Sequence, residues 1–361
     1  MNNISMYPKL FKRIFKKDGL PLQLIFFITD QCNCKCKHCF LKGQLNNSRN
    51  LLRLEEIEKI SCSMADLLSL SLTGGEPFMR EDIVEIVRLF VKNAKVKNIV
   101  TITNGIDTSK ILTRTESMIH VLGKNSLMVS VSIDGIDKAH DDIRQFKGAF
   151  EKANKTLKEL LALSKRHSNL IVGTSTTCAA QNQKNLKDLY KYLRSMGVEN
   201  IGINLVRPNV WNEDFDGPDI SNYDEITNIK LNDLARGMKE YAGLWASSFF
   251  KAKEAIQYRL ISSIYKNKCF MTPCCAGSVV GVLWWDGNVF PCEMLKNSMG
   301  NIRESDYNFK ELWFSKKAKE CRNFIKTTKC FCTYECVMTG NILLNARFYP
   351  ELLMRTLLKY E

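Results

Sequence analysis

Apolar residues follow two alternating patterns between residues 22 and 206. Short runs rich in β-branched and aromatic residues, such as LQLIFFIT at 22–29, alternate with longer segments whose apolar residues recur every three or four positions. The first pattern is typical of buried strands and the second of amphipathic helices. Strands are predicted at residues 22–29, 67–73, 98–102, 127–133, 170–176 and 200–206, and helices at residues 53–67, 81–94, 108–122, 149–166 and 184–197.

The regular order of strand and helix predicts parallel strands joined by helical crossovers. The expected fold class is therefore α/β, a partial (β/α)6 TIM-like barrel. Reactive groups in such barrels lie at the carboxyl ends of the strands. Unusual residues fall at these ends: a cysteine-rich loop after the first strand, GGEP after the second, TNG after the third and SIDG at the fourth.

The chain changes character after about residue 207. Residues 222–266 have a helical pattern and hold no cysteine, whereas eight of the 14 cysteines lie between 269 and 336. We expect a small C-terminal iron-sulfur auxiliary domain that is held together by metal rather than by a core of its own. The expected organisation is a basic amphipathic segment at 1–21, the barrel at 22–210, a helical connector at 211–266, the auxiliary domain at 267–340 and a C-terminal helix at 341–361.

The cysteine count is best explained by metal binding or catalysis. No apolar run reaches the roughly 18 to 20 residues of a membrane span, and the N-terminus lacks the apolar stretch of a signal peptide, so we expect a cytoplasmic protein. Disulfides do not persist in that compartment. With only 4 histidines, mixed cysteine and histidine zinc sites are not the main explanation. Sulfur ligands suit zinc or iron-sulfur clusters.

The first cysteine group, QCNCKCKHCF at 31–40, contains a C-x3-C-x2-C spacing formed by Cys32, Cys36 and Cys39. Three thiolates on one loop can hold a cubane cluster by three of its irons and leave the fourth iron open. Catalytic metal sites keep an open position, whereas structural sites are closed. Cys34 is out of register and is predicted to have no ligand role.

Together with the three strand-end motifs, this triad resembles the radical S-adenosylmethionine (SAM) enzymes, over roughly residues 22 to 206. The resemblance implies a 4Fe-4S cluster on Cys32, Cys36 and Cys39, with SAM chelated by the open iron. It further implies reductive cleavage of SAM to a 5′-deoxyadenosyl radical, with a flavodoxin or ferredoxin as the electron donor.

The motif at residues 74–77 is expected to bind the methionyl group of SAM. Gly74 and Gly75 would let the backbone approach without a Cβ, and Glu76, followed by Pro77, offers an acceptor for the ammonium group.

Five further residues are predicted around SAM from the same resemblance. Asn104 and Asp134 can bond ribose hydroxyls, and Ser132 with Arg144 resembles the pair that holds the methionyl carboxylate in peptide-modifying members. His38 stands where the family usually has an aromatic residue near adenine. Its protonation could make activity more dependent on pH.

The second cysteine group resembles the SPASM and twitch extensions of the same superfamily, because Gly287 precedes Cys292 in a Gly-x4-Cys element and a late cysteine cluster follows. The resemblance implies an auxiliary 4Fe-4S cluster. A twitch-like set would be Cys275, Cys292 and two of Cys330, Cys332 and Cys336; a SPASM-like set would be Cys269, Cys275, Cys292 and Cys336. We take Cys275, Cys292, Cys332 and Cys336 as the predicted ligands. Glu293, next to Cys292, is the predicted general base.

The predicted substrate is a peptide or protein side chain, as in enzymes that modify ribosomal peptides or mature sulfatases. The same chemistry on a sugar, glycan or lipid-linked small molecule is the first alternative, partly because no leader-binding module is recognisable before the first strand at residue 22. Nucleic-acid modification is favoured only by the net charge of +14, and a non-enzymatic metal-binding protein is the last alternative.

The N-terminal segment has an apolar stripe on its predicted helix, formed by Tyr7, Leu10, Phe11, Ile14 and Phe15, opposite lysines and arginines. It is predicted either to pack on the barrel or to make a peripheral contact with an anionic membrane.

Overall fold

The computed structural model describes residues 19–47, 50–207, 217–237 and 243–357. The amphipathic stripe predicted between residues 7 and 15 lies outside the described residues. No helix in the described ranges is both long enough and apolar enough to cross a membrane.

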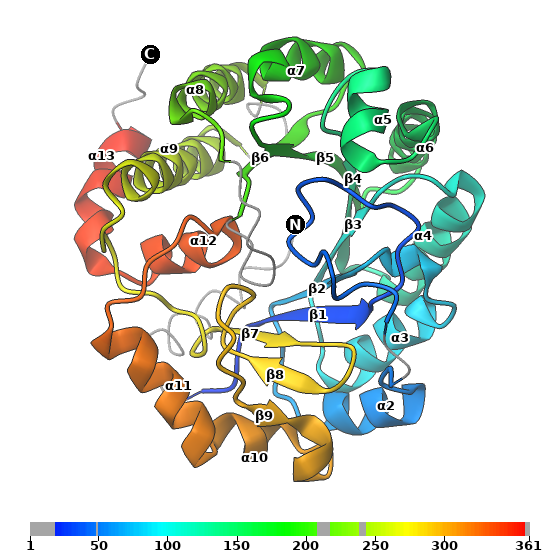
Figure 1. Cartoon of the computed structure of the whole chain (residues 1–361), viewed down its shortest axis with the longest axis vertical. Helices are drawn as coiled ribbons and strands as arrows, with labels where there is room; N and C mark the ends of the chain where they lie inside the picture. The colour runs from blue at the N-terminus through cyan, green and yellow to red at the C-terminus, as the bar shows by residue number, and fades with distance from the viewer. Residues whose placement is uncertain (1–18, 48–49, 208–216, 238–242, 358–361) are drawn as a thin grey trace.

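The strands form one nine-stranded sheet in the order β6-β5-β4-β3-β2-β1-β7-β8-β9, in which β1 to β6 are parallel neighbours (Figure 1). This confirms the partial (β/α)6 barrel. The parallel strands are β1 (Gln23–Thr29), β2 (Ser69–Gly74), β3 (Asn98–Thr103), β4 (Ser126–Ser132), β5 (Leu170–Cys178) and β6 (Asn200–Leu205).

Helices follow the strands and cover the outer side of the sheet (Figure 1). They are α2 (Leu54–Cys62), α3 (Ile83–Asn93), α4 (Thr108–Leu122), α5 (Lys138–Arg144), α6 (Ala149–Ser164) and α7 (Leu186–Ser195). Helix α4 has the predicted bounds because local signals agree with its apolar period. The Asp107 side chain accepts a hydrogen bond from the Lys110 amide at 3.0 Å, and Gly123 ends the helix with a φ of 57°.

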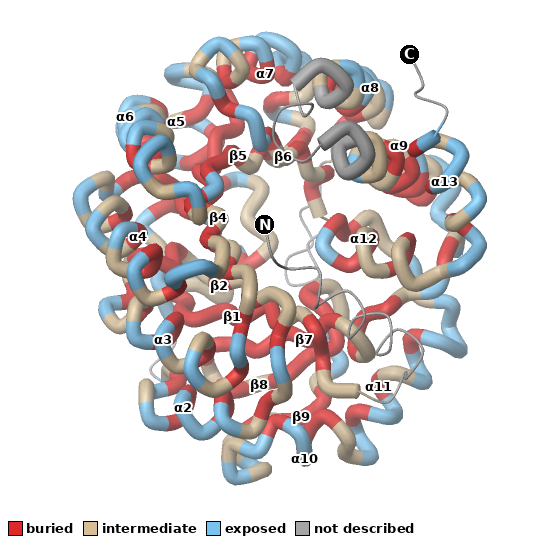
Figure 2. The backbone as a smooth tube through the Cα atoms, turned by 180° about the vertical axis from the view of Figure 1, so that it is seen from behind, coloured by how far each residue is buried: buried red, intermediate tan, exposed pale blue. Residues whose placement is uncertain are grey.

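The C-terminal module continues the barrel sheet. Strand β7 (Val280–Leu283) lies parallel to β1, and β8 (Asn288–Phe290) and β9 (Gly300–Asn301) follow antiparallel. Leu283, Val289, Phe309 and Trp313 belong to the same buried cluster as the barrel side chains. Figure 2 shows buried residues running along β1, β7 and β8. The described apolar residues of this module thus join the barrel core rather than forming a separate one, and pairing of β7 with β1 holds the module in addition to any metal.

Helices α8, α9, α12 and α13 lie on the side of the molecule between β6 and β7, and α10 and α11 lie near β9 (Figure 1). Helices α8 and α9 fall on the segment predicted as a helical connector, and α9 packs against α8, α12 and α13. These helices are α8 (Ile220–Gly237), α9 (Gly243–Asn267), α10 (Phe309–Phe314), α11 (Lys316–Thr327), α12 (Glu335–Leu343) and α13 (Tyr349–Leu357), and short 3-10 turns lie at Pro77–Met79, Gln183–Asn185, Ile302–Ser305 and Ala346–Phe348.

Candidate active site

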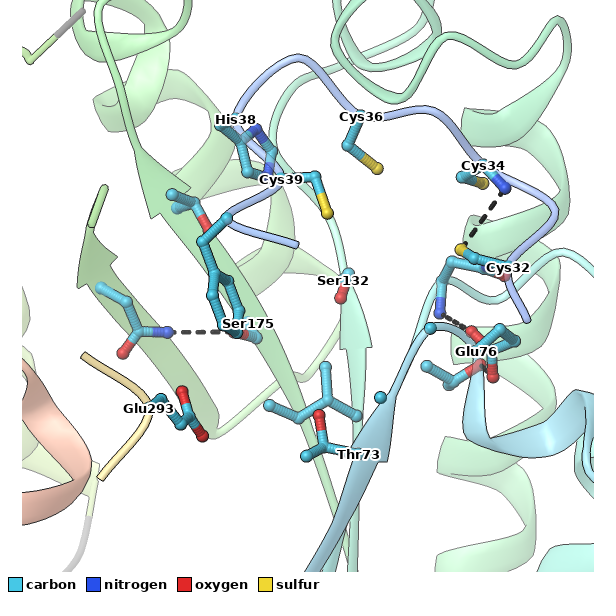
Figure 3. A pocket seen from close by; sticks show the side chains of 18 of the residues that line it. Cys32, Cys34, Cys36, His38, Cys39, Thr73, Glu76, Ser132, Ser175 and Glu293 are labelled. Carbon is cyan, nitrogen blue, oxygen red and sulfur yellow. Dashed lines mark hydrogen bonds between the residues drawn. The ribbon is translucent and has the colours of Figure 1, made fainter. Parts of the chain in front are cut away.

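A cavity of about 270 Å³ opens at the carboxyl ends of the parallel strands. Its walls come from the cysteine loop after β1, the turn after β2, the ends of β3 to β6 and the loop after β8. Figure 3 shows the cysteine loop above the strand ends, with Ser132 below it and Glu293 on the opposite side. Residues from the barrel and from the C-terminal module therefore share one cavity.

The cysteine loop is fixed by backbone contacts to its neighbours. The amides of Lys35 and Lys37 donate to the carbonyls of Arg144 and Ile143 in α5, at 3.3 and 2.9 Å. The Asn46 side chain exchanges hydrogen bonds of 2.9 and 3.1 Å with the backbone of Cys32. The loop is thus held at its start and in its middle by groups that do not involve a metal.

Cys32, Cys34, Cys36 and Cys39 all line the cavity. In Figure 3 the sulfurs of Cys36 and Cys39 point from the loop toward Ser132. Among the described residues, no three His, Cys, Asp or Glu side chains converge on one point closely enough to hold a single metal ion. A cubane is bound at separate irons, so its ligands need not converge on one point. The assignment of Cys32, Cys36 and Cys39 to one cluster stays a prediction. Spacing, rather than burial, distinguishes Cys34 from the predicted ligands.

Among the four cysteines of this loop, Cys36 is the one whose pKa is lowered. A hydrogen bond from Cys34 and the positive charges of Arg144 and His38 lower its pKa to about 5, although burial opposes the shift. The Arg144 guanidinium also donates to the Cys36 sulfur at 3.6 Å. Thiolate is the ligating form of cysteine, so this environment favours metal binding.

Gly74 and Gly75 bring the turn after β2 against the start of the cysteine loop. A Cβ on Gly74 would lie 2.1 Å from the Thr29 carbonyl oxygen, and one on Gly75 would lie 2.1 Å from that of Gln31. The Gly75 amide donates to the Thr29 carbonyl at 2.8 Å. The glycines are therefore required for this approach of two protein backbones, whatever their contact with SAM.

Glu76 is buried and lines the cavity. Its carboxylate accepts hydrogen bonds from the amide of Asn104 at 2.7 Å, the hydroxyl of Thr103 at 2.9 Å and the amide of Phe78 at 3.1 Å. Burial raises the pKa of Glu76 to about 7, against the effect of these hydrogen bonds. A carboxylate can accept about four hydrogen bonds, so one acceptor position is left for a ligand ammonium. Pro77 starts the 3-10 turn behind it.

Asp134 lies beneath the cysteine loop and is not among the residues that line the cavity. Its carboxylate pairs with Arg144 at 2.6 Å, accepts from the Thr177 amide at 2.8 Å and lies 3.6 Å from the His38 ring nitrogen. Because these groups occupy the carboxylate, its predicted contact with a ribose hydroxyl would compete with them and stays a prediction. Asp134 holds Arg144 and His38, which, like Ser132, line the cavity, and the predicted contacts of these three residues with SAM stay predictions.

Asn104 lines the same wall and anchors the loop. Its side-chain amide donates to the Asn33 side chain at 2.7 Å, and its carbonyl oxygen accepts from the Ile106 amide at 3.0 Å. Its predicted bond to a ribose hydroxyl competes with these two contacts.

Around Cys292, the C-terminal module gathers thiols beyond the predicted ligand set. The pKa of Cys292 is raised by burial and then by the nearby thiols of Cys332, Cys274 and Cys330. Cys275 instead packs against α12, with its sulfur 3.5 Å from the Val337 carbonyl oxygen.

Cys336 is exposed to the main cavity. Cys292 thus lies near Cys332, Cys274 and Cys330, whereas Cys336 faces the main cavity. Cys275 adjoins Cys274 and belongs to the same apolar cluster as Cys292. Sequence reasoning missed Cys274, although the adjacent Cys274-Cys275 pair was a visible signal.

Glu293 lines the end of the cavity away from the cysteine loop, and its buried carboxylate pairs with Arg207. Arg207, two residues after the end of β6, was not identified from the sequence. Its position at the end of a barrel strand was the available signal.

A cysteine loop over β1, a glycine turn after β2 and polar residues at the next strand ends define the class: a radical SAM enzyme. Residues 26–193 match the family model of the Radical SAM superfamily, and residues 272–337 match the SPASM iron-sulfur cluster-binding domain. The chain belongs to the radical SAM superfamily and carries a SPASM domain. Its cofactors are accordingly a 4Fe-4S cluster and SAM in the barrel, and an auxiliary iron-sulfur cluster in the C-terminal module.

Known proteins similar to this chain include AlbA of Bacillus subtilis, an antilisterial bacteriocin subtilosin biosynthesis protein, at 28% identity over 80% of this chain. The chain spans 59% of the length of AlbA. The GTP 3′,8-cyclase of Aquifex aeolicus is 25% identical over 84% of this chain and 92% of its own length. Among solved structures, anSMEcpe with bound AdoMet and a Cp18Cys peptide superposes with a TM-score of 0.60 at 19% identity, covering 94% of this chain and 100% of that one. The last similarity shows the fold.

Proposed function

We propose that this enzyme removes a hydrogen atom from a carbon of a peptide or protein side chain and oxidises that substrate. The observation that carries the proposal is the shared cavity, with the SAM-binding motifs at one end and Glu293 at the other. The similarity to AlbA, a bacteriocin biosynthesis protein, supports a peptide as the substrate class.

The charges around the cavity also favour a peptide over a nucleotide. The arginines that line it, Arg144 and Arg207, are each paired with a carboxylate, from Asp134 and Glu293 respectively. A triphosphate is bound best by unpaired cationic groups or helix N-termini. A peptide segment needs hydrogen-bonding groups without a net charge, and Asn204 and Thr177 offer these on the same wall.

When bound, the cofactors supply a 5′-deoxyadenosyl radical, which takes the hydrogen atom, and an auxiliary cluster, which takes one electron. Cys32, Cys36 and Cys39 would hold the first cluster. Cys274, Cys292, Cys330 and Cys332 lie near one another, which supports their assignment as ligands of the second cluster. Glu76 and Ser132 would orient the methionyl group of SAM. Glu293 would accept the proton that leaves the substrate during its oxidation.

Three further proposals concern partners and location. A flavodoxin or ferredoxin would supply the electron for SAM cleavage. Thiol ligands of this kind need a reducing compartment, which supports a cytoplasmic location. The contact of the N-terminal segment with an anionic membrane stays a proposal, to be tested by sedimentation with anionic liposomes of the full chain and of a chain that starts at Gly19.

A second candidate substrate is a nucleotide, because the chain spans nearly the whole length of a GTP 3′,8-cyclase. Co-expression with each short open reading frame that flanks the gene, followed by mass spectrometry, tests the first candidate. A peptide that loses 2 Da or a multiple of it supports the proposal. Conversion of GTP by the purified enzyme, with every peptide unchanged, would replace it with the second candidate.

A further inference from the structure

Arg207 connects three loops that carry cysteines. Its guanidinium pairs with Glu293, which follows Cys292 in the sequence. It also lies 4.8 Å from the ring centre of Phe40, which follows Cys39, and 4.2 Å from the ring centre of Tyr334, between Cys332 and Cys336. The arginine itself extends from the end of β6, so one side chain joins the barrel to both cysteine regions.

The geometry leaves Arg207 little freedom. Its planar cation lies within the range of cation–π attraction of both rings, and its side chain is 20% exposed. A guanidinium presents donors in a fixed plane, so rings that hold this plane also fix the direction in which the donors point. Those donors meet the Glu293 carboxylate.

Glu293 needs such a partner to keep one position. Its side chain is 5% exposed, and a buried carboxylate is costly unless it is paired and hydrogen-bonded. It stands on a loop rather than on a strand or a helix. Without Arg207, the loop backbone would be left to position a group that must meet the substrate within about 1 Å.

We propose that Arg207 is a positioning residue for Glu293. The Phe40 and Tyr334 rings hold the Arg207 guanidinium in one plane, and the guanidinium in turn aims the Glu293 carboxylate at the substrate end of the cavity. This inference rests on the proposed function, in which Glu293 accepts the substrate proton.

The first experiment needs no substrate. The thermal midpoints of Arg207→Gln, Glu293→Gln and the double variant form a double-mutant cycle, with Arg259→Gln and its partner Glu351→Gln as a matched pair outside the cavity. Arg259 and Glu351 also form a two-point pair, at 2.7 Å for both bonds, between α9 and α13. We expect coupling between Arg207 and Glu293. Additive changes in their midpoints would show that the pair does not form and would overturn the proposal.

The second experiment uses the peptide found in the mass-shift screen. Arg207→Gln should lower kcat for product by about 10²-fold with the peptide KM unchanged, because a misplaced group costs about that much. Arg207→Lys, which keeps the charge but not the planar fork, should fall between this variant and the wild type. Free guanidinium should restore product formation to Arg207→Ala. Arg259→Gln should match the wild type.

Two outcomes separate this inference from the proposed function. Product formation at the wild-type rate in Arg207→Gln would contradict the positioning role and leave the enzyme's function intact. Wild-type product formation in Glu293→Gln would remove the proton acceptor, and the proposed roles of Glu293 and Arg207 would both fall.

Discussion

The two cysteine regions differ in what positions their thiols. The loop after β1 is held by directed polar contacts: backbone bonds to α5, the Asn46 clamp and the buried pair of Asp134 and Arg144. In the C-terminal module, Cys275 and Cys292 are embedded in an apolar cluster with Phe27 and Trp284. We call the cysteine loop after β1 the polar-clamped loop. Metal ligands that form a contiguous motif on such a loop can be predicted from their spacing, whereas ligands brought together by packing can be identified only from the fold.

The largest expected effect comes from the polar-clamped loop. Replacing Cys32, Cys36 and Cys39 together with alanine should remove one cluster, leaving about four irons of about eight by ligand counting. Cys34→Ala is the matched control and should keep both clusters. Iron analysis of anaerobically reconstituted protein measures the result. If Cys34→Ala loses as much iron as Cys36→Ala, burial rather than spacing selects the ligands, and the contrast between the two regions weakens.

The next effect tests the ligands gathered by packing. Cys292→Ala should also lose about four irons and abolish product formation, while SAM cleavage without substrate continues. Because Cys274 and Cys330 lie near Cys292, we expect the same loss for Cys274→Ala and Cys330→Ala. Cys275→Ala and Cys336→Ala are the controls and should keep their iron.

Iron loss in Cys292→Ala and in the two control variants, with none in Cys274→Ala or Cys330→Ala, would restore the set predicted from the sequence. The protease pattern after residue 266 should stay as in the wild type in Cys292→Ala, because β7 pairs with β1 through backbone bonds.

A smaller effect tests how tightly the polar-clamped loop is positioned. Gly75→Ala would place a Cβ 2.1 Å from the Gln31 carbonyl oxygen and must displace the segment that carries Cys32. We expect SAM cleavage to slow by about 10²-fold. Gly43 lies in the cysteine loop itself, has a φ of +90° and would have no atom within 4 Å of an added Cβ. Gly43→Ala therefore controls for backbone strain in the loop without a steric clash. Equal rates in the two variants would show that the close approach of the backbones does not position the cluster loop.

The smallest effect concerns the attachment of the C-terminal module to the barrel. Glu56 in α2 accepts hydrogen bonds from Arg303 at 2.8 Å, Tyr307 at 2.9 Å and the Arg53 amide at 2.7 Å. Burial alone would raise the pKa of Glu56, but these bonds lower it to about 2. The shift from an unfolded value near 4.3 means that the charged form of Glu56 stabilises the folded protein, by at most about 3 kcal/mol.

Because the folded pKa is the lower one, this stability is present above about pH 4.3 and is lost as the pH falls toward about 2. Denaturant unfolding should find Glu56→Gln less stable than the wild type at pH 7, and the difference should narrow below pH 4.3. A difference that is constant with pH would contradict the charged pairing. Arg88→Gln, which removes the exposed i,i+3 pair with Glu85, should cost much less.

The barrel was predictable because each element has its own local signal. Helix α4 has apolar periodicity, an N-cap and a terminal glycine, and its bounds were predicted correctly. Helix α5, Lys138–Arg144, was not predicted because its seven residues are too few to establish a period.

The site was predictable only where its residues are neighbours in the sequence. The triad and the glycine turn satisfy that condition. The pairing of Arg207 with Glu293 joins positions 86 residues apart, and it exists because β7 adds to the sheet beside β1. No local pattern encodes that addition.

The central claim is that the three-thiol loop supports reductive cleavage of SAM. The most direct measurement is 5′-deoxyadenosine, quantified by mass spectrometry after the anaerobically reconstituted enzyme is mixed with SAM and a low-potential reductant. We predict its formation by the wild type and by Cys34→Ala, and none by the triple alanine variant of Cys32, Cys36 and Cys39. Equal amounts from the triple variant and the wild type, or none from a wild type that carries its full iron content, would contradict the account.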